Sequence, residues 1–166
     1  TPEYAAFEIE VLHYLRQFDY PCPTPIADTN GLFLKNWKGK PFALFTFLEG
    51  TFVQNPNARP IAEAIARLHV LGENFVPSQH QFRDTYDPGC CRRYAVANAK
   101  KLAVAKASQR LDWLEKNLAT IQLPANLPKG ICHCDTHPSN FLHHDGQLSA
   151  VLDFDDASYM YLLYDV

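Results

Sequence analysis

The sequence predicts an α+β fold, because stretches with helical periodicity alternate with short strand-like runs. Apolar residues recur at helical spacing over 7–18 and again over 61–72. Two pairs of apolar runs flank turn-forming residues, at 37–40 and at 145–146, as they do in β-hairpins. The 166 residues are 47% hydrophobic, so we expect these elements to enclose a core.

The charge and hydropathy pattern argues against nucleic acid and membranes as partners. The net charge is -3, from 15 basic and 18 acidic residues, and no basic stripe is present. The longest apolar runs are too short to cross a bilayer, and no signal peptide is visible. The five cysteines form no Cys-x-x-Cys pair, so we expect reduced thiols in a cytoplasmic protein. The chain starts without Met and ends inside an apolar pattern, so we expect a piece of a longer protein.

The first element is predicted to be a helix that starts at Thr1, where Thr can cap and the following Pro suits the first helical position. Its apolar face comprises Phe7, Val11, Leu12, Leu15 and Phe18. Glu8 and Glu10 lie among these residues, and periodicity alone favours solvated surface charges for both. The proline-rich segment 21–25 ends the helix.

The middle of the chain predicts a hairpin followed by helices. Strands are expected at 32–36 and 42–48, and the second should be buried because it is nearly all apolar. A helix follows Asn57, and its apolar face carries His69, which at such a position is more commonly a core residue than a catalyst. A further helical region is expected over about 91–119.

The same pattern predicts an apolar face and a basic face for that further region. Its expected core residues are Leu102, Leu111, Leu114 and Leu118. Arg92 and Arg93 belong to an expected solvated basic face, and contact with a substrate anion is the less favoured alternative for them.

The stretch 133–153 carries the strongest chemical signal. Asp135 is followed by Asn140 and then, after two short strands around Asp145-Gly146, by Asp153. Because the strands of a hairpin are antiparallel, Asn140 and Asp153 should lie side by side. Three oxygen-bearing side chains at one point suit a hydroxyl nucleophile beside magnesium-bound phosphates, with Asp135 accepting the hydroxyl proton.

A zinc site is the alternative for the same segment. Its candidate ligands are Cys132, His133, Cys134 and His137. In an extended segment the two cysteines share one face while His133 points to the other. Four ligands within six residues is also an unusual zinc spacing, so we favour the magnesium interpretation.

The motif blocks resemble the kinase-like small-molecule phosphotransferases, which include aminoglycoside phosphotransferases, choline kinases and homoserine kinases. HCDTHPSNFL (133–142) is similar to that group's H-x-D-x-x-x-x-N motif, and LSAVLDFDDA (148–157) to its metal-binding loop. The order of blocks most resembles the kinase-like homoserine kinases. These blocks are FEIEVLHYL, PCPTPI, GKPFALFTFLEG, IARLH, ENF, LPKGICHCD and LLYD.

The resemblance implies a protein-kinase-like fold of two lobes that uses ATP and Mg²⁺. A partial N-lobe with the hinge would span 1–48, and a mostly helical C-lobe with the catalytic hairpin would span 49–166, both incomplete. Asp135 then looks like the catalytic base and His133 like the histidine that braces its loop. Asn140 and Asp153 look like the magnesium ligands.

The resemblance also implies roles for residues outside the motif. Glu8 matches the helix glutamate that pairs with a phosphate-binding lysine, which replaces the surface interpretation given above. Asp165 resembles the aspartate that steadies the catalytic loop. The hinge, whose backbone would bind adenine, comprises Thr46, Phe47 and Leu48. The expected substrate-binding residues are His137, Asp155 and Asp156.

The sequence departs from the family pattern in three places. No Gly-rich phosphate loop with its lysine precedes Glu8, so we expect the chain by itself to be inactive. His137-Pro138 is more typical of the broad group than of homoserine kinases, and Asp155 stands where many kinases have glycine.

The implied function is ATP-dependent phosphorylation of the hydroxyl of a small amino alcohol, with L-homoserine, and hence threonine biosynthesis, as the best candidate. An acid-rich pocket floor formed by Asp135, Asp155 and Asp156 suits an ammonium group. Aminoglycosides, choline and other amino alcohols are alternative acceptors, and a non-catalytic kinase-like binding module is the other class of function considered. The sequence leaves the oligomeric state and the role of His69 open.

Overall fold

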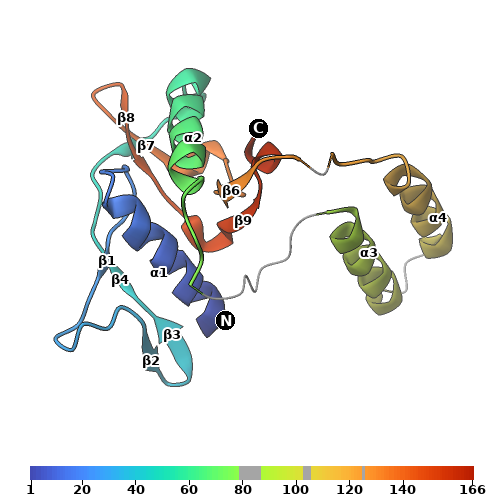
Figure 1. Ribbon diagram of the computed structural model, residues 1–166, viewed down its shortest axis with the longest axis horizontal. Helices are drawn as coiled ribbons and strands as arrows, with labels where there is room; N and C mark the ends of the chain where they lie inside the picture. The colour runs from blue at the N-terminus through green and yellow to red at the C-terminus, as the bar shows by residue number, and fades with distance from the viewer. Residues whose placement is uncertain (79–86, 103–105, 125) are drawn as a thin grey trace. The chain divides into compact units, whose positions relative to one another are not determined.

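The computed structural model describes residues 1–78, 87–102, 106–124 and 126–166. The chain forms two compact units (Figure 1). The first unit comprises residues 1–83 and 128–166, and the second comprises residues 84–127. The candidate catalytic motif and both N-terminal helices lie in the first unit. Within the described ranges, no helix is long and apolar enough to cross a membrane.

The helix α1 (Pro2–Arg16) begins as the sequence predicts. The Thr1 hydroxyl accepts a hydrogen bond from the Tyr4 amide, and proline occupies the first turn. Phe18 lies beyond the last helical residue and is 40% exposed, so it does not share the buried face. The buried apolar residues of α1 are Phe7, Ile9, Val11, Leu12 and Leu15.

The helix α2 (Ala58–Gly72) also has the predicted start, with the Asn57 side chain accepting from the Arg59 amide. Its buried face ends at Gly72, which contacts the strand β6 (Lys129–Cys132). A Cβ added at Gly72 would lie only 2.7 Å from the backbone nitrogen of Ile131. The close approach of α2 to β6 therefore requires glycine, which has no side chain, at position 72.

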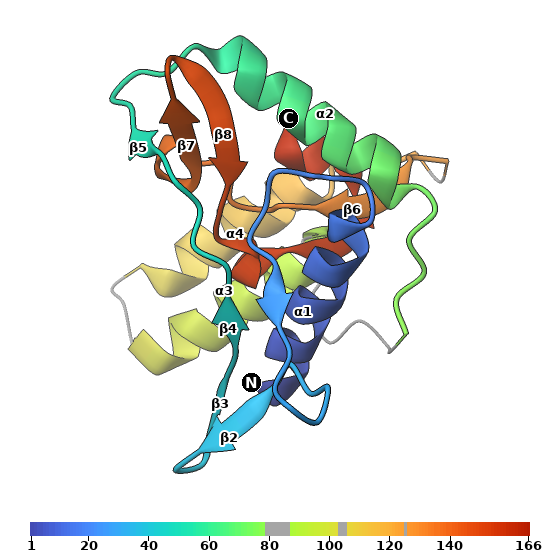
Figure 2. The same ribbon diagram turned by 90° about the vertical axis from the view of Figure 1, so that its left-hand side faces the viewer.

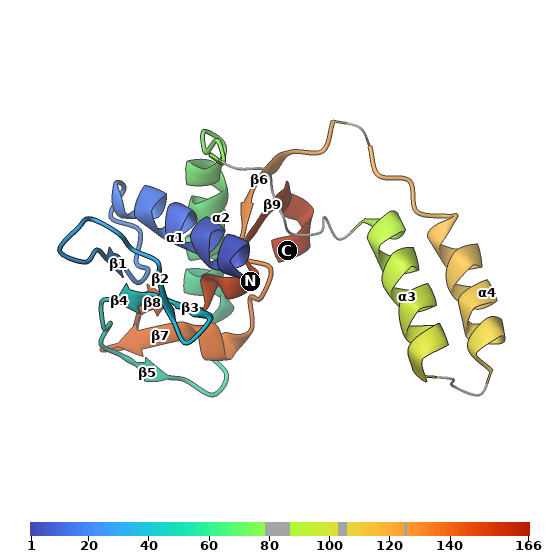
Figure 3. The same cartoon turned by 90° about the horizontal axis from the view of Figure 1, so that it is seen from below.

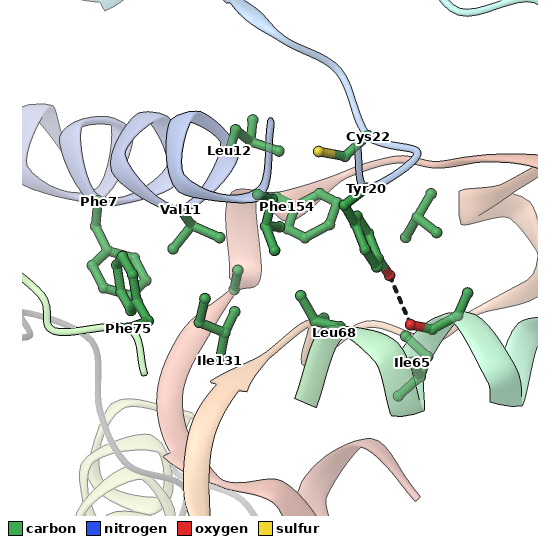
Figure 4. Close-up of a cluster of buried hydrophobic side chains, with 14 of the residues drawn as sticks. Phe7, Val11, Leu12, Tyr20, Cys22, Ile65, Leu68, Phe75, Ile131 and Phe154 are labelled. Carbon is green, nitrogen blue, oxygen red and sulfur yellow. Dashed lines mark hydrogen bonds between the residues drawn. The ribbon is translucent and has the colours of Figure 1, made fainter. Parts of the chain in front are cut away.

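The core of the first unit lies between α1, α2 and the strands that lead to the motif (Figure 4). The Tyr20 hydroxyl is buried there and donates to the Ala64 carbonyl of α2 at 3.1 Å. Burial raises the pKa of the Cys22 thiol to about 12 and also raises the pKa of Tyr20. Phe154, next to Asp153, is fully packed in this core, so the motif is anchored to it.

The predicted turn at 37–40 is confirmed, but the predicted buried strand at 42–48 is wrong. The strand β2 (Lys35–Trp37) pairs with β3 (Lys40–Phe42), whereas β1 (Pro25–Ile26) pairs with β4 (Leu44–Phe45). Phe42 is 43% exposed, Leu44 62% and Phe47 88%. An apolar run predicts a buried strand only where both faces of the sheet are covered. These are two-stranded pairs, and within the described chain these three side chains lack such cover.

The predicted hairpin around Asp145-Gly146 is confirmed. The strands β7 (Phe141–His144) and β8 (Gln147–Val151) pair antiparallel, and β5 (Thr51–Phe52) adds a third strand beside β7 (Figure 2). Asp145 and Gly146 both have positive φ angles, as a tight two-residue hairpin turn requires. His143 is 7% exposed, and its Nδ1 has no hydrogen-bond partner among the described residues.

The motif is framed by a second strand pair and three short 3₁₀ turns. The strand β6 pairs antiparallel with β9 (Ser158–Tyr161). The 3₁₀ turns are η1 (Pro138–Asn140), η2 (Phe154–Asp156) and η3 (Leu162–Asp165). The motif thus runs from β6 through η1 into the hairpin, and from the hairpin through η2 into β9.

The second unit contains two helices where the sequence predicts a single helical region. They are α3 (Pro88–Leu102) and α4 (Ala107–Leu118), which lie side by side (Figure 3). Lys106 adopts φ 64°, which stops a right-handed helix at that residue. Arg92 of α3 pairs with Glu115 of α4 at 2.6 Å.

Of the three predicted core leucines of this unit whose side chains the structure describes, one is buried. Leu118 is 8% exposed, and Leu111 and Leu114 are half-buried. The side chain of Leu102 lies outside the described residues, as do residues 103–105.

Candidate active site

The loop that carries Asp135 is braced by His133, which is fully buried. The Asp135 amide donates to His133 Nδ1 at 3.3 Å, so the proton lies on Nε2. His133 Nε2 in turn donates to the Leu152 carbonyl at 2.8 Å, just before Asp153. The imidazole also packs against Phe141 and Phe154, with centroids 6.2 and 4.8 Å away. One ring therefore joins the loop of Asp135 to the loop of Asp153.

Asp165, at the end of η3, accepts hydrogen bonds from the start of the same loop. Its Oδ2 accepts from the His133 amide at 2.7 Å and its Oδ1 from the Cys134 amide at 2.8 Å. Cys134 has φ 65°, a left-handed conformation that costs on the order of 1 to 3 kcal/mol for a residue other than glycine. These bonds help to hold that conformation, which is the geometry expected of a loop-steadying aspartate.

Asn140 connects η1 to Asp135. Its Nδ2 donates to the backbone carbonyl of Asp135 at 3.0 Å and to the carboxylate Oδ2 at 2.9 Å. Because both of these Asp135 oxygens are acceptors, the side-chain amide of Asn140 is oriented with Nδ2 toward Asp135. Its Oδ1 therefore faces away from Asp135. Among the described residues, no hydrogen bond to Asp135 Oδ1 is found.

Asp153 lies at the same end of the hairpin as Asn140. Phe141 is paired with Val151, and the Leu152 amide donates to the Asn140 carbonyl at 2.7 Å. Asp153 follows directly, is exposed, and has φ 63° and ψ 61°. The hairpin therefore brings the predicted metal ligands together as the antiparallel argument requires.

The donor chemistry at this end of the hairpin fits a hard divalent cation. Asn140 offers an amide oxygen, and Asp153 and Asp135 offer carboxylates, which are the ligands that Mg²⁺ prefers. The zinc alternative is not supported, because His133 uses both ring nitrogens in hydrogen bonds. Cys132 and Cys134 contact other groups, the Tyr161 carbonyl at 3.4 Å and the Met160 sulfur at 3.3 Å.

The residues predicted to bind substrate lie around this centre. His137 is exposed and caps η1, since its Nδ1 accepts from the Ser139 amide at 3.3 Å and lies 2.8 Å from the Ser139 hydroxyl. Its Nε2 therefore carries the proton. Asp155 and Asp156 are exposed on η2, directly after Asp153.

The residues predicted to bind nucleotide lie on α1 and after β4. Glu8 is half-buried on α1. The Thr46 amide donates to the Thr24 carbonyl at 2.9 Å, and the Thr46 hydroxyl accepts from the Thr24 amide. The Thr46 amide is thus engaged within the fold, and adenine recognition by the hinge backbone stays a prediction for Thr46, Phe47 and Leu48.

Sequence reasoning missed the partner of Asp165 on α2. His69 Nε2 lies 2.9 Å from Asp165 Oδ2, across 96 positions of sequence. The only local signal was a histidine on an otherwise apolar helix face, which is also what a core histidine produces.

Comparison with known proteins finds curated relatives that are named homoserine kinases. The homoserine kinase of Rhodospirillum rubrum is 33% identical over 171 residues, which cover 100% of this chain and 52% of the relative. The homoserine kinase of Bradyrhizobium diazoefficiens is 30% identical over 169 residues, covering 96% of this chain and 50% of the relative. The chain spans about half the length of these curated relatives.

Solved structures with the same fold include a kinase and a phosphotransferase that were solved with nucleotides bound. Amicoumacin kinase hAmiN, solved in complex with AMP-PNP, Ca²⁺ and Ami, has a TM-score of 0.69 at 17% identity, covering 99% of this chain and 52% of that protein. Spectinomycin phosphotransferase APH(9)-Ia, solved with ADP and spectinomycin, has a TM-score of 0.67 at 16% identity, covering 96% of this chain and 56% of that protein. These matches confirm the protein-kinase-like α+β fold.

A family model described as the phosphotransferase enzyme family (APH) matches residues 1–166. This match spans the loop of Asp135, the catalytic hairpin and Asp165, whose geometry is described above. The chain therefore belongs to the phosphotransferase enzyme family.

Proposed function

We propose that the protein containing this chain transfers the γ-phosphoryl group of ATP to the hydroxyl of a small amino alcohol, with L-homoserine the best candidate. The observation that carries the proposal is the contact of Asn140 Nδ2 with the Asp135 carboxylate at 2.9 Å. This contact fixes a carboxylate beside an amide oxygen, at the end of a hairpin that also carries Asp153. The homoserine kinases that match over 96 to 100% of this chain support the choice of acceptor.

Asp135 is the proton acceptor in this proposal. Asn140 holds Oδ2, so Oδ1 can accept the proton of the acceptor hydroxyl as its oxygen forms the new bond to phosphorus. The bond between the γ-phosphorus and the bridging oxygen breaks, and ADP leaves. Because His133 and Asp165 hold the loop from two sides, the carboxylate is positioned before substrate binds.

Asn140 Oδ1 and Asp153 are the proposed holders of Mg²⁺, which when bound neutralises the charge of the phosphates. Glu8 and the hinge residues Thr46, Phe47 and Leu48 would bind the nucleotide. Residues 1–48 would belong to an N-lobe and residues 49–166 to a C-lobe. The solved relatives named with AMP-PNP and Ca²⁺ or with ADP support nucleotide and divalent-cation use. The five free cysteines agree with the proposed cytoplasmic location.

His137 supports an amino acid as the acceptor. Its Nε2–H is a donor on an exposed side chain, which suits a carboxylate, while Asp155 and Asp156 suit an ammonium group. Homoserine carries both groups, whereas choline carries only the cation. An acceptor panel of homoserine, choline, spectinomycin and other amino alcohols ranks these possibilities by kcat/KM.

The test of the catalytic role is Asp135→Asn in the full-length protein. Loss of a general base typically lowers turnover by about 10² to 10⁴, so we expect kcat to fall by that range. The KM for ATP should change by less than about twofold, because uniform nucleotide binding is not altered. ADP release with homoserine measures both parameters.

The matched control is Asp145→Asn, which removes a carboxylate from the exposed turn of the same hairpin. It should leave kcat unchanged. Near-normal turnover in Asp135→Asn would contradict the catalytic assignment, and absence of ADP release with every acceptor in the panel would contradict the proposed activity.

A further inference from the structure

Three sulfur atoms meet where the loop of Asp135 begins. The single methionine of the chain, Met160, places its Sδ 3.3 Å from the Cys134 Sγ. The Cys134 thiol also contacts the Cys132 thiol, and this contact, together with burial, raises the pKa of the Cys132 thiol. None of these three side chains has a role in the phosphoryl transfer proposed above.

The pairing of β6 with β9 explains why the methionine lies at this place. Met160 is opposite Gly130, and Cys132 lies two residues after Gly130 on β6. Because paired residues and residues two apart share a face, Cys132 and Met160 lie on the same face of the strand pair. The Cys132 Sγ is 3.9 Å from the Met160 carbonyl, in agreement with this placement.

The three sulfur-bearing residues differ in their exposure. Cys132 and Met160 are fully buried, whereas Cys134 is half-buried. An ion can therefore arrive from solvent at the Cys134 thiol and then be enclosed by the two buried side chains. This arrangement suits an ion that is bound without water.

The donor chemistry selects Cu(I) among the common metal ions. Thiolate and thioether sulfur are soft ligands, which Cu(I) prefers, whereas Mg²⁺ binds oxygen. Structural Zn²⁺ takes four thiolate, imidazole or carboxylate ligands, and one of the three sulfurs here belongs to a thioether. The neighbouring imidazole of His133 has both nitrogens in hydrogen bonds, so it does not supply a further ligand.

We propose that Cys132, Cys134 and Met160 form a binding site for Cu(I). Each thiol releases its proton to solvent as its sulfur binds the ion, and the thioether binds without losing a proton. The copper keeps its oxidation state throughout. The site uses neither of the proposed magnesium ligands, Asn140 and Asp153.

A different donor set shares Cys132, since ligand atoms of His69, Cys132 and Asp165 lie within 4.8 Å of one another. That set offers one sulfur, one nitrogen and one carboxylate oxygen, which suits Zn²⁺ better than Cu(I). Both oxygens of Asp165 already accept hydrogen bonds from backbone amides of the loop. The two sets can be told apart, because only the proposed one contains Cys134 and Met160.

The binding test is an anaerobic competition for Cu(I) between the reduced protein and the chelator bathocuproine disulfonate. The wild-type chain should retain one Cu(I). Cys132→Ser and Cys134→Ser should each weaken binding by about 100-fold or more, since even residues that only support metal ligands contribute up to about that factor. Met160→Leu, which conserves volume and so keeps the test decisive if a serine at buried Cys132 prevents folding, should weaken it by about tenfold. No copper in the wild type, or equal retention by Cys134→Ser and Met160→Leu, would overturn the proposal.

The matched control is the double variant Cys90→Ala/Cys91→Ala, which removes the thiols of two adjacent cysteines elsewhere in the chain. It should bind Cu(I) as the wild type does. Loss of the copper in this variant would place the ion in the second unit and overturn the proposal.

X-ray absorption at the copper edge identifies the ligands directly. We expect three sulfur neighbours in the wild type and two in Met160→Leu. A nitrogen neighbour that disappears in His69→Phe would assign the ion to the other donor set and overturn the proposed site.

Occupation of the site should slow phosphoryl transfer, a consequence that rests on the proposed function. Cys134 directly precedes Asp135, and its amide donates to Asp165 Oδ1 at 2.8 Å. A metal bond to the Cys134 thiol would shift this loop, so we expect Cu(I) to lower kcat of the full-length protein by about tenfold or more. At a Cu(I) concentration that loads only the wild type, kcat of Met160→Leu should be the same with and without copper. Equal inhibition of the two proteins would overturn this effect.

The binding and kinetic experiments separate this inference from the proposed function. The competition and the absorption spectrum need no substrate, so they decide on the site even if no acceptor is phosphorylated. Normal phosphorylation by copper-loaded protein would leave the proposed function intact and overturn the effect of the site on rate.

Discussion

Asn140 and His133 show how single side chains connect the parts of this site. The two ring nitrogens of His133 bond to the Asp135 amide and to the Leu152 carbonyl. Asn140 bonds to Asp135 through its side chain and to the Leu152 amide through its backbone carbonyl. Both are buried, so these polar groups are satisfied inside the fold rather than by water. The consequence is that Asp135, Asn140 and Asp153 hold their mutual positions even though Asp153 itself is exposed.

At the same scale, Cys22 predicts how stability depends on alkaline pH. Burial raises the pKa of its thiol to about 12, whereas an unfolded thiol ionises near pH 9. Its contribution to stability is therefore full below pH 9 and is lost as pH rises toward 12, because only the unfolded chain releases the proton in that window. Tyr20, whose pKa is also raised by burial, should add a loss in the same direction above about pH 10.

The measurement is the free energy of unfolding by urea at pH 8, 9.5 and 11, compared between the wild-type chain and Cys22→Ala. The variant should be less stable at pH 8 but lose less stability as the pH rises. Parallel pH curves for the two proteins would show that the thiol is not the titrating group. Cys91→Ala, at an exposed thiol, is the matched control.

At the scale of elements, Gly72 predicts the sensitivity of the contact between α2 and β6. Gly72→Ala would place a Cβ 2.7 Å from the Ile131 nitrogen, where backbone must move. We expect a loss of about 1 to 3 kcal/mol in unfolding free energy, as for other overpacked sites. Urea denaturation measures it.

Gly89→Ala is the comparison for that experiment, because the atom nearest to its added Cβ belongs to the Asp87 side chain, at 3.1 Å. Alanine is the better helix former there, so this variant should be neutral or slightly more stable. Equal stability of Gly72→Ala and the wild-type chain would mean that α2 and β6 separate without cost.

Local signals explain which elements the sequence could predict. The cap at Asn57 and the turn Asp145-Gly146 are determined by residues within a few positions, and both elements occur where expected. The region 91–119 contained no proline or glycine to mark a break, so the left-handed Lys106 could not be foreseen. The exposure of Leu44 and Phe47 could not be predicted either, because an apolar run does not reveal whether anything packs against it.

In the candidate site, too, the parts formed by neighbouring residues could be predicted from the sequence, whereas contacts between distant residues could not. The spacing of Asp135 and Asn140 and the intervening hairpin before Asp153 were visible in one contiguous stretch. The link from His69 to Asp165 joins positions 96 residues apart, and the pairing of β6 with β9 is also distant in sequence. Periodicity reports which face of a helix is buried but not which partner lies beneath it.

At the scale of the whole molecule, the first unit should unfold cooperatively through its shared core. Leu68 of α2 is fully buried in this core, so Leu68→Ala should lower the unfolding free energy by about 2 to 5 kcal/mol. Val70→Ala, two positions away and 63% exposed, should change it by less than about 0.5 kcal/mol. Both values come from urea denaturation.

Exchange of the His133 and Cys134 amides should follow global stability in the Leu68→Ala variant. A loss confined to α2, with the β6 and β9 amides still protected as in wild type, would contradict a single cooperative core. Such a result would mean that the site and the helix that supports it unfold separately.

The position of Asp165 also has a consequence for the order of folding. Its bonds reach back 31 and 32 residues to the catalytic loop and 96 residues to α2. Closing such long loops costs entropy before any contact forms, so these bonds should be among the later ones to appear. During synthesis the helices α1 and α2 leave the ribosome first, and the loop of Asp135 follows with its amides uncovered. The loop gains the Asp165 carboxylate only when η3, which follows it in the sequence, has also been made.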